Sequence, residues 1–250
     1  YFNEIIDAQA SMFHTGRRAL MLGDQPAQES PVAGQAYAFL LDIAGQDEAS
    51  LNLDGLGNSG RDSSTLSVVA VDLSTLSTLQ APTYRAVKRV AWTGLNHLAV
   101  FGQIKAMADA WRPMYVAVDA TGVGEGMWAM LDKSFPGKVL PVKFSQQVKS
   151  EIGWKFLAII ETGRFRDCCP TAEVDEQYLK CQSEILPGPA KTLRWGVKDG
   201  TRGADGQLVH DDFVLSDALC AVLDDLQWFI QHETVIIQGV DPLDLAEGNY

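Results

Sequence analysis

Residues 114–126, MYVAVDATGVGEG, indicate the fold more clearly than any other stretch of the sequence. The apolar run that ends at Asp119 predicts a buried strand, and the glycines after it predict a turn into a helix that continues as GMWAMLDKSF. A strand that leads through a glycine turn into a helix is typical of a sheet with parallel strands. Asp119 then lies at the carboxyl end of its strand, where open α/β sheets bind ligands.

Further apolar segments predict one mixed sheet around this strand. Strands are expected at residues 36–45, 64–73, 84–94, 138–144 and 191–200, and helices at 95–111, 147–165, 171–186 and 210–230. The first three strands follow one another without a helix between them. We therefore expect an α/β fold in which an antiparallel meander continues into parallel strands, flanked by helices.

Composition divides the chain into three parts. Residues 1–20 look helical and residues 22–35 are poor in apolar side chains, so residues 1–34 are expected to be an N-terminal helix and linker remnant of a longer chain. Residues 35–231 form the expected domain, and residues 232–250 a polar tail. A Gly-, Asp- and Ser-rich stretch over 45–64 predicts a mobile loop.

The charge and the cysteine content limit the possible classes of function. With 20 basic and 32 acidic residues, the net charge of -12 argues against unaided attraction to nucleic acid or to a membrane surface. It does not exclude a nucleic-acid enzyme, because carboxylates that hold metal ions count as negative until the metal binds. No apolar run approaches the roughly 20 residues of a membrane span, so we expect a soluble protein. The 4 cysteines lack CxxC spacing and read as reduced thiols.

Acidic residues stand at the ends of three predicted elements. Asp42 ends the strand at 36–45, Asp119 ends the strand before the glycine turn, and Asp211 and Asp212 begin the last helix. A helical wheel puts the Asp211–Asp212 pair at the N-terminal end of the apolar face, although one of the two could serve only as a helix cap. The same wheel puts Asp217 on the opposite face, so we expect Asp217 to be solvated and dispensable.

Carboxylates that converge without histidine or thiolate partners suit hard cations such as Mg²⁺ or Mn²⁺. Two such ions about 3.5–4 Å apart can activate water and stabilise the leaving oxygen of a phosphodiester. The pattern therefore favours a metal-dependent phosphodiester hydrolase with two divalent ions.

These segments resemble a known family. DIAG around Asp42, VAVDATGVGEG around Asp119 and HDDFVLSDALCAVLD at the last helix are similar to the nuclease domain of the large terminase subunit of tailed bacteriophages, over about residues 35–230. The resemblance implies an RNase H-like (RuvC-type) fold and an endonuclease that cuts concatemeric double-stranded DNA during packaging. It implies that Asp42, Asp119 and Asp212 are the catalytic acids and bind metal together with Asp211, with His210 assisting.

The resemblance also implies partners and a location. The partners would be double-stranded DNA, an ATPase motor domain, the portal and the small terminase subunit, in the host bacterial cytoplasm. The motor is not part of this sequence, since no G-x-x-x-x-G-K-[ST] loop occurs. Many relatives carry a further acid shortly after the paired aspartates, and Asp217 is the candidate counterpart despite its place on the wheel.

A DNA substrate requires positive charge near the acids. The candidates for phosphate contacts are Arg85, Lys88, Lys143, Lys149, Arg194, Lys198 and Arg202, with Arg89 and Arg164 among further basic residues. The alternative for each of them is the role of an ordinary surface residue that keeps the protein in solution. The loop at 45–61 and the hairpin near 198–206 are expected to flank the site, and Trp195 contacts either DNA or the core.

Other functions share parts of this pattern. Another RNase H-fold nuclease, such as a junction resolvase or transposase, would use the same chemistry on a different substrate. An actin-like ATPase also has a strand-end Asp and a glycine turn, but it gives the HDD helix no evident role. A non-enzymatic assembly module, in which the acids only cap helices, remains a further alternative.

Overall fold

The computed structural model describes residues 10–44 and 63–228. A six-stranded sheet in the order β6-β5-β2-β3-β4-β7 forms its centre. The strands are β2 (Ala36–Asp42), β3 (Ser63–Asp72), β4 (Thr83–Thr93), β5 (Tyr115–Asp119), β6 (Val139–Val142) and β7 (Phe165–Asp167). β2, β3 and β4 pair antiparallel, whereas β5 and β6 extend the β2 side and β7 the β4 side in parallel. The predicted meander that continues into parallel strands is confirmed.

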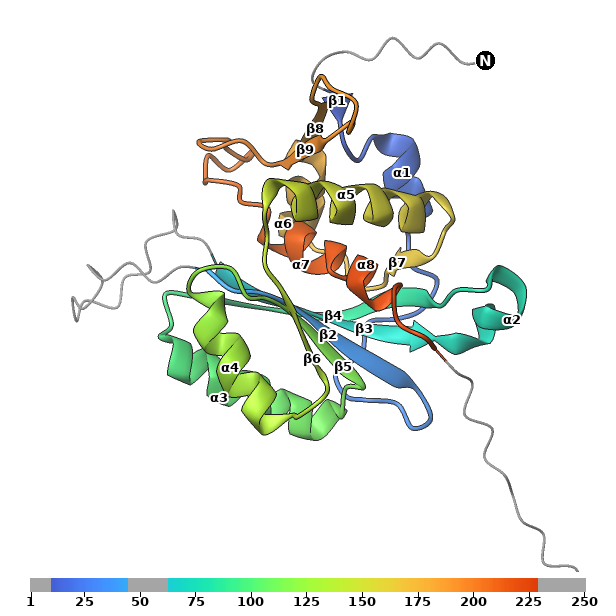
Figure 1. Cartoon of the computed structure of the whole chain (residues 1–250), viewed down its shortest axis with the longest axis vertical. Helices are drawn as coiled ribbons and strands as arrows, with labels where there is room; N and C mark the ends of the chain where they lie inside the picture. The colour runs from blue at the N-terminus through green and yellow to red at the C-terminus, as the bar shows by residue number, and fades with distance from the viewer. Residues whose placement is uncertain (1–9, 45–62, 229–250) are drawn as a thin grey trace, which may run out of the picture.

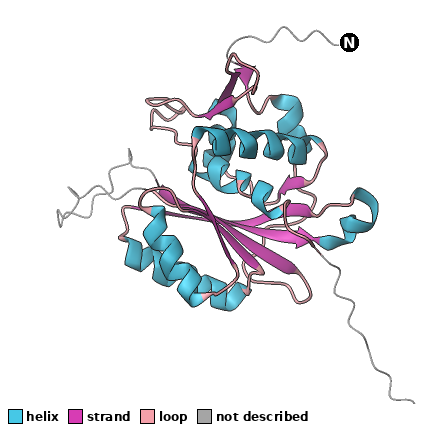
Figure 2. Ribbon diagram, viewed as in Figure 1, coloured by secondary structure: helices cyan, strands magenta, loops and turns pink. Residues whose placement is uncertain are grey.

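Helices cover both faces of this sheet (Figures 1 and 2). One face carries α3 (His97–Trp111) and α4 (Gly124–Ser134); the other carries α5 (Gln146–Glu161), α6 (Ala172–Lys180), α7 (Asp212–Ala218) and α8 (Cys220–Leu223). Side chains alternate along β2, so that Phe39 and Leu41 pack in the α3–α4 core while Ala38 and Leu40 pack in the α5–α7 core. Both faces of the strand are buried, which explains its continuous apolar run.

Smaller elements complete the fold above α5 in Figure 1 and at the far end of the sheet. β1 (Ala10–Ser11), β8 (Gln182–Ile185) and β9 (Leu193–Gly196) form a separate three-stranded antiparallel sheet, so the strand expected at 191–200 does not belong to the central sheet. α1 (Thr15–Leu20) precedes the main sheet, and a 3-10 turn (Leu73–Thr75) and α2 (Leu76–Leu79) connect β3 to β4.

Several local expectations differ from the structure. Of the helix expected over residues 1–20, the first nine residues lie outside the described part of the chain, residues 10–11 form β1, and Thr15–Leu20 is helical. The helix expected over 171–186 ends at Lys180, because the chain continues as β8. The helix expected over 210–230 consists of α7 and α8, and the short strand β7 was not expected. The loop predicted over 45–61 and the tail at 232–250 lie outside the described residues.

The predicted domain boundary at residue 35 stays a prediction. Met12 and Phe13, which precede it, are fully buried in the core on the α5 side. Within residues 10–44 and 63–228, none of the helices has the length and apolar character of a membrane span.

The small sheet packs on α5 through a glycine–tryptophan contact. Trp195 of β9 is 4% exposed, and its indole N–H donates to the carbonyl oxygen of Lys149 at 2.7 Å. The ring lies against Gly153 of α5, where a Cβ would stand 2.3 Å from Nε1. Trp195 is therefore a core residue, and the position of β9 depends on the missing side chain at Gly153.

Gly153→Ala tests this contact. The added methyl group forces the indole or β9 to move, so we expect a loss of about 1–3 kcal/mol in the free energy of unfolding, as in other overpacked cores. Urea denaturation measures the change. Gly102→Ala in α3, where a Cβ meets nothing within 4 Å, is the matched control and should stabilise the chain by up to ~1 kcal/mol. Equal effects at both positions would show that the contact with Trp195 does not limit packing.

Candidate functional site

Asp42 and Asp119 lie side by side at one end of the sheet. Leu41 of β2 pairs with Val118 of β5, and each aspartate follows one residue later on parallel strands. The two carboxyl groups are close enough for the charge of Asp119 to raise the pKa of Asp42. Asp42 is 8% exposed and points to the α7 side of the sheet, in step with Leu40.

The turn after β5 fixes Asp119 from its own strand. Its Oδ1 accepts from the backbone N–H of Thr121 at 2.7 Å, and Thr121 Oγ1 accepts from the N–H of Phe144 at 2.8 Å. A Cβ at Gly124 would stand 2.1 Å from the carbonyl oxygen of Asp119. The sequence therefore needs a glycine there for α4 to begin so close to the strand end.

The start of α7 supplies the other two acids. Asp211 precedes the helix, and its Oδ2 accepts from the N–H of Val197 at 3.3 Å and lies 3.8 Å from Lys149 Nζ. Asp212 is 9% exposed, and its Oδ2 accepts from the N–H of Ser63 at 3.0 Å. α7 thus brings two carboxyl groups from the end of the chain to the strand ends.

Repulsion from the neighbouring acids is evident in the pKa of Asp42. Burial raises the pKa of Asp42 well above its usual range, and the charges of Asp212, Asp119 and Asp211 raise it further. Burial also raises the pKa of Asp119, against its hydrogen bonds to Thr121 and the charge of Lys149. The site holds more negative charge than its surroundings neutralise, which a bound cation would relieve.

Two cavities border these acids. One of about 410 Å³ is lined by Asp42, Asp211, Asp212, His210 and Lys198, among others. A second of about 530 Å³ lies on the α6 side and shares His210 and Asp212 with the first. The structure therefore brings together all the acids expected from the sequence, with His210 beside them.

The basic candidates separate into two groups. Lys149 and Lys198 border the acids, and Lys143, which pairs with Glu125 at 2.7 Å, follows the end of β6 next to Asp119. The others have local partners: Arg85 with Asp72, Lys88 with Glu29, Arg194 with Glu184, and Arg202 with the carbonyl oxygen of Gly206. Arg164 is buried against Asp224.

The prediction that Asp217 is solvated is wrong. Asp217 is fully buried, and Arg89 Nη1 donates to both of its carboxylate oxygens at 2.8 Å. Arg89 is buried as well, with a side chain 4% exposed. The helical wheel assumes that one face of the helix is exposed to solvent. Because α7 lies between the sheet and α6, the Asp217 carboxylate is buried and needs a counterion.

Polar residues of β3 were missed at the sequence level. Thr65 Oγ1 donates to the carbonyl oxygen of Asp212 at 3.0 Å, and Ser67 Oγ lies 3.0 Å from Ser216 Oγ. With Ser63 these residues alternate along an otherwise apolar strand, which is the signal that could have identified them. They tie α7 to the sheet beside the acids.

No three Asp, Glu, His or Cys side chains within the described ranges 10–44 and 63–228 stand so that they could hold one metal ion as they are. The charges of Asp212, Asp119 and Asp211 nevertheless act on Asp42.

Comparison with solved structures identifies the fold. The magnesium-bound large terminase nuclease of thermophilic phage G20c matches with a TM-score of 0.59 at 19% identity, covering 85% of this chain and 96% of that one. The nuclease domain of Thermus phage P74-26 matches with a TM-score of 0.54 at 18% identity, covering 89% and 100%. The large terminase of bacteriophage HK97 matches with a TM-score of 0.56 at 8% identity, covering 85% and 43%. The sheet and its helices define an RNase H-like fold.

Comparison of sequences gives the family. The family model described as the terminase RNaseH-like domain matches residues 55–190, more than half of the chain. The chain belongs to this family, and the resemblance noted from its motifs is confirmed. A probable terminase ATPase subunit of Haemophilus phage HP1 is 26% identical over 81 residues, which are 32% of this chain and 13% of the phage protein. Of the acids above, the family match includes Asp119.

Asp42→Asn tests the repulsion among the acids. A raised pKa in the folded state means that this group stabilises the fold fully below its unfolded pKa of about 3.8 and that the contribution is lost as pH rises through the folded value. In EDTA at pH 7.5, we expect the variant to melt about 2–4 °C above the parent, which corresponds to ~1 kcal/mol in a domain of this size. The difference should shrink as the pH falls towards 4.

Differential scanning fluorimetry across pH measures these melting temperatures. Asp109→Asn, an exposed acid paired with Lys105, is the control and should change little. A variant at position 42 that melts below the parent at pH 7.5 would contradict the repulsion.

Proposed function

We propose that this chain is the metal-dependent endonuclease domain of a phage DNA-packaging terminase large subunit, which cuts concatemeric double-stranded DNA. The observation that carries the proposal is that Asp42 lies beside Asp119 on paired parallel strands and lines one cavity with Asp211 and Asp212. Membership of the terminase RNaseH-like family supports a nuclease over the actin-like alternative.

The acids fit divalent metal ions by their chemistry. The donors are carboxylates only, they repel one another, and Lys149 is the cation that acts on Asp42 and Asp119. Asp42, Asp119 and Asp212 would hold two ions, Mg²⁺ or Mn²⁺, with Asp211 as a fourth ligand. Mg²⁺ usually takes only one or two carboxylates and keeps water or substrate phosphate as its other ligands, so pairs of acids suffice. Magnesium is bound in the related G20c nuclease.

When bound, the ions would supply an activated water and neutralise charge on the phosphodiester. Hydrogen bonds within the chain orient these acids: the backbone N–H of Thr121 orients Asp119, and that of Ser63 orients Asp212. His210 borders the same cavity and is proposed to assist at the scissile phosphate.

DNA would be bound through its phosphates close to the acids. Lys143, Lys149 and Lys198 supply positive charge at this edge, although the chain as a whole carries -12. Contacts to phosphates position a duplex without reading its sequence, so cleavage should show little sequence preference.

The activity of the whole protein is also a proposal. By family, the chain would work in the host bacterial cytoplasm with an ATPase motor domain, the portal and the small terminase subunit. The match to the probable terminase ATPase subunit of phage HP1, a much longer protein, supports a motor elsewhere in the same polypeptide.

Asp42→Asn, Asp119→Asn and Asp212→Asn test the nuclease proposal. Each should lower the rate of plasmid cleavage in Mn²⁺ or Mg²⁺ by at least ~100-fold, because a bound ion contributes several kcal/mol to the transition state and each 1.4 kcal/mol is tenfold. Agarose gels of relaxed and linear product measure the rate, and circular dichroism checks the fold. Asp225→Asn, which removes an exposed acid paired with Lys155, should cut normally. Normal cutting by both Asp42→Asn and Asp119→Asn would defeat the proposal.

Lys198→Ala tests the DNA contact. In EDTA, we expect weaker binding to a fluorescent 30-base-pair duplex and a slope of log K against log [salt] smaller by about 0.9, the value for one phosphate contact. Lys88→Ala, which lies away from the acids and pairs with Glu29, should leave both quantities unchanged. The DNA surface would have to be relocated if only Lys88→Ala weakened binding.

A further inference from the structure

α7 is tied to the sheet by a ladder of polar contacts that begins at Asp212. The backbone N–H of Ser63 donates to Asp212 Oδ2, and Thr65 Oγ1 donates to its carbonyl oxygen, both at 3.0 Å. One turn further along α7, Ser216 Oγ lies 3.0 Å from Ser67 Oγ. Because Ser63, Thr65 and Ser67 alternate along β3, all three face the helix.

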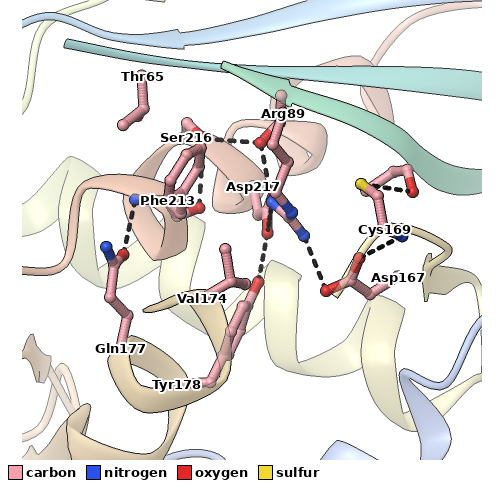
Figure 3. A network of polar contacts seen from close by, with 12 residues as sticks. Thr65, Arg89, Asp167, Cys169, Val174, Gln177, Tyr178, Phe213, Ser216 and Asp217 are labelled. Atoms are coloured by element: carbon pink, nitrogen blue, oxygen red, sulfur yellow. Dashed lines mark hydrogen bonds and ion pairs between the residues drawn. The ribbon is translucent and has the colours of Figure 1, made fainter. Parts of the chain in front are cut away.

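Arg89 closes this ladder from the next strand. It pairs with Ser67 across β3 and β4, and its Nη1 donates to Ser67 Oγ at 3.0 Å and to both oxygens of Asp217 at 2.8 Å. Its Nη2 lies 3.0 Å from Asp167 Oδ2, and the hydroxyl of Tyr178 donates to Asp217 at 2.7 Å. Figure 3 shows Arg89 reaching from the sheet between Asp217 and Asp167.

A β-bulge is what aims Arg89 into this network. The pairing of β3 with β4 shifts between Val68 and Val69, so that Val87 is an extra residue of β4. Ala86 faces the α7 side before the shift and Arg89 faces it afterwards. Bulges commonly re-aim a side chain next to a functional site.

The network is a costly way to hold a helix. Burial lowers the pKa of Arg89, but the charges of Asp217 and Asp167 raise it more, so the guanidinium stays charged inside the protein. Buried ion pairs often stabilise a fold no better than apolar residues of the same size, whereas their fixed geometry allows one arrangement only. With both oxygens of Asp217 engaged, α7 cannot slide or rotate on β3 without breaking several contacts.

We propose that the Arg89–Asp217 pair is a positioning device that sets where α7 presents Asp212, and that it thereby sets the affinity of the site for divalent ions. Asp217 acts through the helix and does not bind metal, because Arg89 and Tyr178 occupy its oxygens. This inference rests on the proposed metal-dependent function. Partners that orient metal ligands typically change metal affinity 10- to 100-fold when they are removed.

The chain contains its own matched control. Seven residues after Asp217, Asp224 receives Arg164 Nη1 and Nη2 at 2.6 and 2.9 Å and the hydroxyl of Tyr84 at 3.0 Å. This second Arg–Asp–Tyr group ties the end of the same helical segment to the start of β4, at the end of the sheet away from Asp42. Breaking it should destabilise the fold without moving Asp212.

The experiment titrates Mn²⁺ into the full chain by isothermal calorimetry, with melting temperatures in EDTA measured in parallel. Asp217→Asn and Tyr178→Phe should weaken Mn²⁺ binding about tenfold or more. Asp224→Asn and Tyr84→Phe should lower the melting temperature comparably and leave Mn²⁺ affinity within about twofold of the parent. If Asp217→Asn does not fold, Tyr178→Phe, which removes one hydroxyl, decides the question.

Two results would overturn this inference without affecting the proposed function. The first is that folded Asp217→Asn binds Mn²⁺ as tightly as the parent chain or, where that variant does not fold, that Tyr178→Phe does. The second is that the Asp224 and Tyr84 variants lose as much affinity, because the loss would then be a general effect of stability. A parent chain that binds no Mn²⁺ would instead refute the proposed function, and the positioning role with it.

Discussion

Like charges have to be held together against their repulsion, and this constraint governs the α7 side of the sheet. Asp42 is buried among three other carboxyl groups, and the charges of all three raise its pKa. Such an arrangement persists only if the elements that carry the acids are fixed by contacts elsewhere. Two of them are strands paired in register, and the third is a short helix that has to be fastened to the sheet.

Much of this could be predicted from the sequence. Apolar runs that end in aspartate mark Asp42 and Asp119, and Gly124 permits the close start of α4 beside Asp119. Parallel pairing of β2 and β5 then follows from the helical crossover between meander and strand. These signals are local, which is why they survive in a single sequence.

What could not be predicted depends on tertiary packing. Asp217 looks solvated on a helical wheel, yet α7 is covered on both sides and its carboxylate meets Arg89. Arg89 looks like a surface cation in a strand, because the bulge at Val87 is not visible in the residue pattern. β7 and β8, with 3 and 4 residues, are too short to give a periodic signal and depend on their neighbours.

The Arg89–Asp217 pair indicates why charge is used where apolar packing would serve. An apolar contact between α7 and β3 tolerates small shifts, since dispersion has no preferred direction. A guanidinium that bridges Asp217, Asp167 and Ser67 does not, because the hydrogen bonds of Nη1 to Asp217 and Ser67 and the ion pair of Nη2 with Asp167 have to be made at the same time. If only stability mattered, an apolar contact would therefore be enough. The Arg89–Asp217 ion pair is needed because Asp212 has to lie at a fixed distance from Asp42. The same logic accounts for Thr65 and Ser67: their hydroxyl groups and the backbone N–H of Ser63 fix the height of the helix on the strand, and Arg89 fixes its rotation.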